Sequence, residues 1–316
     1  MLKTDNTSRN LCIAFVLLLL VGLILPNWLA FLTTIALAKA MVVVGLVMLM
    51  RAGLVSFGQG LYYCLGGYTV GIAGQHLGIT DAVGILFVSA FIAGCLAALL
   101  GLLLCRYREI FFAMLTLAFS MILYGVLVKT SELGSTDGFN VAKVTLLGWQ
   151  PSPGQLSLVV YSLACLVAFL TAFFMHRYYQ SGMGFAGEAV RENEIRVEYL
   201  GVSPQRVVFI KYVLAAMLAA VGGSITAMIA GHVDPEMAYW TTSGEFVFVA
   251  LLGGTGHVVA AFIGAFLFEV IRTIAFDLAP YTWQMILGTT LLLVIFFLPK
   301  GLWSLLKAKK VGGNNV

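Results

Sequence analysis

Residues 31–50 read FLTTIALAKAMVVVGLVMLM, a run of apolar and small residues that contains a single charged side chain, Lys39. A helix that crosses a bilayer needs about 20 predominantly apolar residues. This run is therefore long enough and apolar enough to predict a transmembrane helix. The rest of the chain repeats the same pattern, so the fold class follows from this stretch and its copies.

The composition excludes a soluble protein. Hydrophobic residues make up 61% of the 316 residues and charged residues only 10%, whereas soluble domains carry about 25% charged residues. A water-soluble fold cannot bury that much apolar surface, because its surface area grows too fast relative to its volume. The length leaves room for roughly ten spans, short loops and no separate catalytic domain.

Nine further apolar runs predict nine more spans, which makes the chain an all-α integral membrane protein, a polytopic bundle of about ten transmembrane helices. Lys3 and Arg9 precede the first run, as in a signal peptide, but Pro26 to Ala30 lacks a small-x-small cleavage site. We therefore expect a retained first span. With residues 31–50, the predicted spans are 11–25, 59–78, 82–104, 110–128, 156–175, 207–230, 240–252, 258–276 and 281–298.

The basic residues predict the topology. Short cytoplasmic loops collect Lys and Arg, and these residues fall on one side if the spans alternate strictly and the chain breaks at Gly253–Gly256. Both termini are then expected in the cytoplasm, and the net charge of +4 indicates topology rather than nucleic-acid binding. The residues concerned are Lys3, Arg9, Arg51, Arg106, Arg108, Arg177, Arg191, Arg196, Arg206, Lys300, Lys307, Lys309 and Lys310.

The loop of residues 176–205 predicts a short amphipathic cytoplasmic helix. Glu192 and Arg196 stand at i,i+4 in the favourable order, and Gly201 is a stop signal. Such a helix either docks against a partner or lies flat on the membrane surface. Its expected apolar side consists of Ala189, Val197, Tyr199 and Leu200.

Motifs for chemistry are absent from the sequence. It has no Gly-x-x-x-x-Gly-Lys-[Ser/Thr] phosphate loop and no metalloprotease or nucleophile-elbow motif. The four His residues are scattered, and the five Cys lie in or beside apolar runs. We expect no enzyme activity, no ATP binding through a phosphate loop, no metal, no cofactor and no disulfide.

Charged residues within apolar runs are candidate functional groups, because a charge at mid-bilayer is costly. Glu269 and Arg272, at i,i+3, form either a structural pair near the external end or part of a site. Glu245 is either a cap near Ser243 or a functional group. Lys39 either faces a pathway, where it would favour an anionic ligand, or pairs with a carboxylate on a neighbouring helix.

An ordered set of motifs resembles the permeases of branched-chain amino-acid ABC transporters, of the LivH/LivM type and closer to LivM. The resemblance covers roughly Ala36 to Trp303. It is carried by Ser56-Phe57-Gly58-Gln59, Gly66-Gly67-Tyr68, Phe112–Phe119, Thr136-Asp137-Gly138, Arg191-Glu192-Asn193-Glu194 with Leu200-Gly201, Asp234-Pro235, Ser243-Gly244-Glu245, Leu252–Gly256 and Phe297–Leu302.

The resemblance implies one permease domain over residues 1–316, with a coupling loop at 176–205 and a basic cytoplasmic tail at 299–316. Expected partners are a second homologous permease, two cytoplasmic ABC ATPases and a periplasmic substrate-binding protein, in the bilayer of a bacterial inner membrane. The loop helix would be the coupling helix that seats in an ATPase groove, with Glu188, Arg191, Glu192, Asn193, Arg196, Leu200 and Gly201 as its candidate contacts.

The resemblance also suggests a pathway. Its candidate residues are Gln59, Tyr68, Gly253 and Gly254 from the motifs above, together with Lys39 and Glu245, which are candidates because they are charged groups within or beside apolar runs. Asp137-Gly138 forms either a turn or a docking point for the binding protein. Lys39 and Met50-Arg51 depart from the family pattern, which leaves branched-chain amino acids, urea or amides, and carboxylates open as substrates. The alternative function is a secondary transporter driven by an ion gradient, which would need acidic or His relays at the midplane.

Overall fold

The computed structural model describes residues 7–22, 24–152, 154–298 and 301–304. That part of the chain is a bundle of twelve α-helices with one pair of two-residue strands. The elements are α1 (Thr7–Gly22), α2 (Asn27–Met50), α3 (Gln59–His76), α4 (Ala82–Leu104), α5 (Glu109–Lys129), η1 (Ser131–Leu133), β1 (Phe139–Asn140), α6 (Leu156–Tyr179), α7 (Gly182–Glu192), α8 (Glu194–Tyr199), α9 (Pro204–Ala230), β2 (His232–Val233), η2 (Pro235–Ala238), α10 (Trp240–Gly253), α11 (Val258–Leu278) and α12 (Trp283–Phe297).

Each predicted span coincides with a helix, and six of the described helices are long and apolar enough to cross a membrane: α2, α4, α5, α6, α9 and α11. The all-α membrane fold is therefore confirmed. The four other predicted spans, α1, α3, α10 and α12, are shorter or less apolar. At about 1.5 Å per residue, a helix of 14 residues such as α10 covers only about 21 Å of a hydrocarbon core about 30 Å thick.

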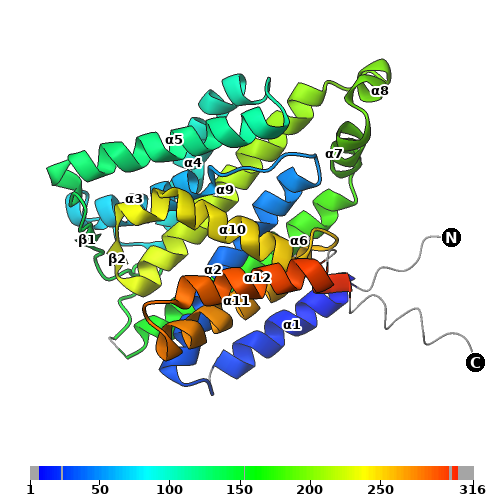
Figure 1. Cartoon of the computed structure of the whole chain (residues 1–316). Coiled ribbons are helices and arrows are strands. Elements are labelled where there is room, and N and C mark those ends of the chain that lie inside the picture. The colour runs from blue at the N-terminus through cyan, green and yellow to red at the C-terminus, as the bar shows by residue number, and fades with distance from the viewer. Residues whose placement is uncertain (1–6, 23, 153, 299–300, 305–316) are drawn as a thin grey trace, which may run out of the picture.

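Burial separates a central helix from peripheral ones. Of the most apolar window in each helix, 89% is buried in α2, but only 28% in α4 and 22% in α5. Because apolar side chains cover the outer faces of α4 and α5, these faces are suited to lipid. Figure 1 shows α7 and α8 at one end of the bundle and β1 and β2 at the other. We call these the α7–α8 end and the β1–β2 end.

Small residues allow the central helices to approach closely, as is common in membrane bundles. A Cβ added to Gly45 of α2 would lie 2.9 Å from the Cα of Ala215 in α9. A Cβ added to Gly66 of α3 would lie 2.0 Å from the carbonyl oxygen of Ala220 in α9. The hydroxyl of Ser224 donates to the carbonyl of Gly66 at 3.0 Å across the same crossing. Helix α9 therefore packs backbone to backbone against both α2 and α3.

The substitution Gly223→Val is expected to prevent stable folding, because a Cβ there would lie 1.8 Å from the carbonyl oxygen of Tyr63. Overpacking usually costs about 1–3 kcal/mol, and this backbone neighbour has little freedom to move. We expect a loss at the upper end of that range or beyond, measured as a lower melting temperature in detergent. Gly125→Val in α5 is the matched control, since no atom lies within 4 Å of its added Cβ. Equal melting temperatures for the two variants would contradict the prediction.

A two-stranded antiparallel ladder joins the loop after α5 to the segment after α9. Phe139 pairs with Val233, and Asn140 with His232. Gly138 has a φ of +65°, and a Cβ there would lie 1.9 Å from the carbonyl oxygen of Val233. Gly138 is thus needed for the packing of this end, whereas the neighbouring Asp137 is exposed.

The predicted single loop helix is wrong, because the structure divides it into α7 and α8 at Asn193. That residue has φ −161° and ψ 102°, and its side chain accepts from the N–H of Arg196 at 2.9 Å, which caps α8. The break removes the i,i+4 relation between Glu192 and Arg196, and no ion pair joins them in the described structure. It also divides the predicted apolar side, because Val197 is buried whereas Tyr199 and Leu200 are 88% and 76% exposed.

Candidate functional site

Four charged side chains from three helices form a cluster inside the bundle, which we call the charged quartet: Lys39, Glu245, Glu269 and Arg272. The Nζ of Lys39 lies 3.1 Å from Glu245 Oε2 and 2.6 Å from Glu269 Oε1. Nη1 of Arg272 lies 3.6 Å from Glu245 Oε2 and 3.8 Å from Glu269 Oε1. The two cations and two anions balance, and each carboxylate lies between two cations.

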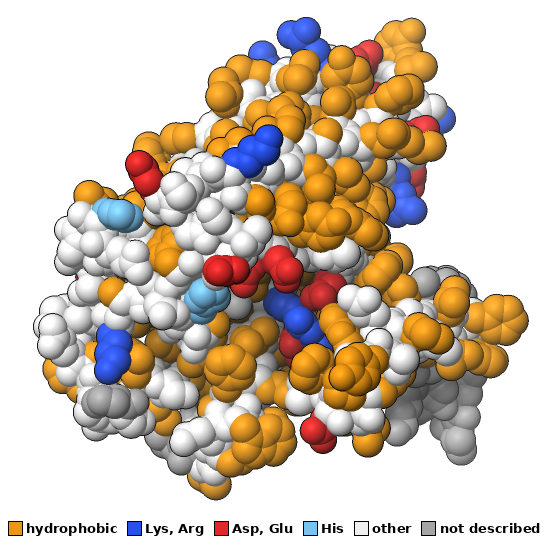
Figure 2. All heavy atoms as spheres, turned by 60° about the vertical axis from the view of Figure 1, so that its left-hand side comes forward, with side chains coloured by type: hydrophobic (Ala, Val, Ile, Leu, Met, Phe, Trp, Pro, Cys, Tyr) orange, Lys and Arg blue, Asp and Glu red, His pale blue; other side chains and the backbone are white. Residues whose placement is uncertain are grey.

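Exposure differs within the quartet. The side chains of Lys39 and Glu269 are 6% and 8% exposed, whereas those of Glu245 and Arg272 are 21% and 37% exposed. Figure 2 shows basic and acidic side chains side by side in a hollow of one face that is otherwise mostly apolar or uncharged. Lys39 and Glu269 are thus buried and pair with each other, whereas Glu245 and Arg272 keep part of their surface accessible to a solute.

The quartet tests the alternatives left open by the sequence. Lys39 pairs with carboxylates on two neighbouring helices, as one of its two readings predicted. Glu269 and Arg272 form the predicted i,i+3 pair, and Arg272 also lies close to Glu245. Because both carboxylates neutralise Lys39, an anionic solute would find no free positive charge at its ammonium group.

Irregular backbone lies beside α3 and α5 at the start of α10. The hydroxyl of Ser120, in the middle of α5, donates to the carbonyl of Ala238 in η2 at 2.7 Å. The N–H of Gly60 donates to Ser243 Oγ at 2.9 Å. Non-helical backbone at membrane depth occurs where protein surrounds it or where it lines a water-filled path. Here Ser120 of α5 supplies a partner to η2, and Ser243 of α10 accepts from the first turn of α3.

Two predicted pathway residues in α3 have unsatisfied polar groups. Gln59 is fully buried and Tyr68 is 3% exposed. Neither the amide of Gln59 nor the hydroxyl of Tyr68 has a hydrogen-bond partner among the described residues. A buried polar group without a partner is costly, so these atoms are available to water or to a polar solute.

The other two predicted pathway residues lie in a packed break. Gly254 has a φ of +94°, and a Cβ on Gly253 would lie 2.2 Å from the carbonyl oxygen of Ala260. Leu302 N–H donates to the carbonyl of Leu252 at 2.9 Å. The predicted helix break is confirmed, and both glycines are buried against α11 and the Gly301–Leu302 segment.

Two ion pairs attach the α7–α8 unit to different helices of the bundle. Arg51, which caps the C-terminus of α2, donates through Nε to Glu188 of α7 at 2.9 Å. Arg108, which precedes α5, donates through Nε and Nη2 to both carboxylate oxygens of Glu194 in α8, at 3.1 and 2.6 Å. The Arg108 pair is a two-point guanidinium–carboxylate contact with fixed geometry, whereas Arg51 binds one oxygen of Glu188. These contacts connect α7 to the end of α2 and α8 to the start of α5.

The outer surface of the α7–α8 unit is exposed and mixed in character. On this surface, exposed charged and polar residues lie beside large apolar side chains that are also exposed. We call these exposed residues the α7–α8 surface: Phe185, Arg191, Glu192, Asn193, Ile195, Arg196, Tyr199, Leu200 and Gly201. Six of the seven predicted coupling residues belong to it. The seventh, Glu188, is held by Arg51 instead.

A family model described as "Branched-chain amino acid transport system / permease component" matches residues 27–295. The chain belongs to this permease family. The permease is 29% identical to the high-affinity branched-chain amino acid transport system permease protein LivM of Escherichia coli, over 83% of this chain and 65% of that protein. It therefore spans slightly less than two thirds of the length of this LivM.

Two further relatives are also branched-chain amino acid transport system permease proteins. The permease is 26% identical to BraD of Pseudomonas aeruginosa, over 88% of this chain and 95% of that protein. It is 26% identical to LivH of Salmonella typhimurium over 57% of this chain and 54% of that protein. The predicted resemblance, closer to LivM, is confirmed, and no solved protein structure matches the permease.

Sequence reasoning missed two residues of the permease that the structure brings into ion pairs. The sequence indicated Arg108 only as a sign of topology, and Arg51 as a sign of topology and a departure from the family pattern, although each binds a carboxylate of the α7–α8 unit. Their position directly beside a span end was the available signal. An arginine at the end of a span is part of the membrane helix or its cap, and its long side chain can bind a carboxylate of a neighbouring helix in the loop.

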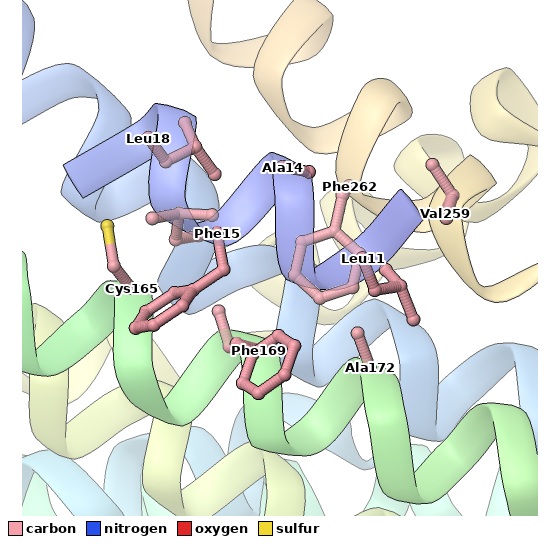
Figure 3. A pocket seen from close by; sticks show the side chains of 11 residues that line it. Leu11, Ala14, Phe15, Leu18, Cys165, Phe169, Ala172, Val259 and Phe262 are labelled. Atoms are coloured by element: carbon pink, nitrogen blue, oxygen red, sulfur yellow. The ribbon is translucent and has the colours of Figure 1, made fainter. Parts of the chain in front are cut away.

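The permease also has an apolar cavity of about 130 Å³ that does not suit a polar solute (Figure 3). Phe15 of α1 stacks on Phe169 of α6 at its wall, with ring centroids 4.9 Å apart. Its lining residues come from α1, α2, α6 and α11: Leu11, Ala14, Phe15, Leu18, Leu37, Cys165, Ala168, Phe169, Ala172, Val259 and Phe262. Because none of them carries a charge, the quartet is the better candidate for solute contact.

Proposed function

We propose that the permease is one subunit of an ATP-driven ABC importer in a bacterial inner membrane and forms half of its translocation pathway. Its partners are a second homologous permease, two ABC ATPases and a periplasmic substrate-binding protein. The substrate is a branched-chain amino acid or a related small polar or carboxylate solute. Ten membrane crossings, with α10 as a short one, put all the basic loops on the cytoplasmic side.

The single observation that carries this proposal is the attachment of the exposed α7–α8 unit to two membrane helices. Its surface offers charged and apolar groups to a soluble partner, while Arg51–Glu188 and Arg108–Glu194 connect its inner side to α2 and α5. A displacement of this unit by an ATPase therefore moves helices inside the bundle. A helix that merely lay on the membrane surface would not require two such attachments.

The pathway is proposed to run past the charged quartet and the start of α3. Glu245 and Arg272 offer one anion and one cation that are partly exposed. The unpaired atoms of Gln59 and Tyr68 offer neutral hydrogen-bonding groups. Asp137, exposed at the β1–β2 end, is a candidate contact for the binding protein. This set suits a small solute with polar ends.

Reversing both charges of Arg191 and Glu192 is expected to uncouple ATP hydrolysis from uptake. Both side chains are exposed on the α7–α8 surface, so the exchange changes partner contacts without disturbing the fold. The measurement is uptake and ATPase activity in vesicles that contain both permeases, the ATPases and the binding protein. Normal uptake by the variant would contradict the coupling role. Uptake driven by an ion gradient without the ATPases would overturn the importer itself.

A further inference from the structure

A hollow of about 480 Å³ opens between the last turn of α4 and the first turn of α9, at the α7–α8 end. It lies away from the charged quartet, which comes from α2, α10 and α11. Its lining mixes polar and apolar residues from the two helices and the segments beside them: Gly101, Leu102, Cys105, Arg106, Ser203, Gln205, Arg206 and Phe209.

Two guanidinium groups face this hollow without a counter-charge. Arg106 and Arg206 are both exposed, and neither forms an ion pair with a carboxylate in the described part of the chain. Arg51, Arg108 and Arg272, in contrast, each bind a glutamate. The first turn of α9 also begins here, where backbone N–H groups lack helical acceptors and the helix dipole is positive. The hollow therefore attracts anions.

An apolar row continues from the hollow along the lipid-suited face of α4. Leu99 and Leu102 are each 66% exposed, and Phe209 is half-buried at the wall. Gly101 opens the space for that ring, since a Cβ there would lie 3.0 Å from it. A phosphate in the hollow would thus have apolar surface directly beside it, toward the membrane interior.

We propose that this hollow binds the phosphate headgroup of an anionic phospholipid from the cytoplasmic leaflet, with its acyl chains along Leu99 and Leu102. Basic pockets between membrane helices on the cytoplasmic side are suited to such headgroups. A free phosphate would make no contact with the apolar row. An acidic protein segment would fill the hollow but would leave the row in contact with lipid. Phospholipid alone matches both the charge and the apolar surface.

The test compares lipid binding by the permease and its Arg106→Gln, Arg206→Gln double variant, purified as full chains with their partner subunits. Native mass spectrometry measures Kd for phosphatidylglycerol, phosphatidylcholine and glycerol phosphate. Each basic residue near an anionic lipid surface contributes about 1 kcal/mol, so the double variant is expected to bind phosphatidylglycerol roughly 30-fold more weakly. The unchanged permease is expected to bind phosphatidylglycerol at least about tenfold more tightly than the other two probes.

Lys129→Gln with Lys143→Gln is the matched control, since it removes two exposed positive charges near the β1–β2 end. It is expected to leave phosphatidylglycerol binding unchanged, and the single Arg variants are expected to be intermediate. Equal binding of phosphatidylcholine or of glycerol phosphate, or an equal loss in the control, would overturn the proposal. So would release of the ATPases from the double variant with lipid binding intact, because the arginines would then contact protein.

Discussion

Replacing Lys39 with methionine is expected to abolish uptake and to destabilise the permease by about 3–5 kcal/mol, the usual cost of removing one partner from a buried ion pair. Lys39 is the cation closest to both carboxylates, at 3.1 and 2.6 Å. Without it, Glu269 stays buried with only Arg272 at 3.8 Å. The measurements are solute uptake in vesicles and the melting temperature in detergent.

A compensating variant separates charge balance from a role in transport. Lys39→Met with Glu269→Gln leaves Glu245 and Arg272 as a neutral pair, so most of the lost stability is expected to return. Uptake is expected to stay low, because Lys39 no longer holds Glu245 in place. Unchanged uptake in Lys39→Met alone would refute the pathway role, and additive stability losses would show that the two side chains do not interact.

Placing two aspartates on the α7–α8 surface, at Tyr199 and Leu200, is expected to detach the ATPases while the permease stays folded. The two side chains are 88% and 76% exposed, so the substitutions cost little folding energy. Hot-spot residues at the centre of an interface, among which Tyr is enriched, account for about 2 kcal/mol or more of binding energy each, and we expect Tyr199 and Leu200 to form such a centre. Their joint loss then weakens association by about a thousandfold, which co-purification and ATP-driven uptake would both report.

The control for this variant places the same two charges at the opposite end of the molecule. Leu147 and Trp149, in the loop before α6, are 79% and 53% exposed, and Leu147→Asp with Trp149→Asp is expected to retain the ATPases. Retention of the ATPases by the Tyr199 and Leu200 variant as well would exclude this face as the docking surface.

The helices could be predicted from the sequence because hydropathy and length determine them locally. The run at residues 31–50 and the run at 82–104 both coincide with helices α2 and α4. The loop helix could not be predicted correctly, since helix-forming residues on both sides concealed the cap formed by Asn193. A hydropathy profile does not show that the first helix ends before Asn193 and that a second helix begins after it.

The charged quartet was only partly predictable. Each member was a candidate, because a charge inside an apolar run is unusual. The i,i+3 pair of Glu269 and Arg272 was expected, but the meeting of all four side chains was not predictable. Lys39 and Glu245 are 206 residues apart, and the rotation of three helices decides their contact. The missing hydrogen-bond partner of Gln59 was equally hidden, because the start of α3 packs beside residues far along the chain, such as Ser243.

Helix α2 carries Lys39 of the quartet and is capped by Arg51, which binds α7. Twelve residues separate them, which is about 18 Å along a straight helix. No proline interrupts residues 27–50, and α2 is buried on nearly every side. Helix α2 is therefore a straight, well-supported connection between α7 and the quartet. If the proposed ATPase displaces α7, α2 would transmit that displacement to the ammonium group of Lys39 as an axial shift or a twist. A solute that loosens the quartet would then displace α7 in turn.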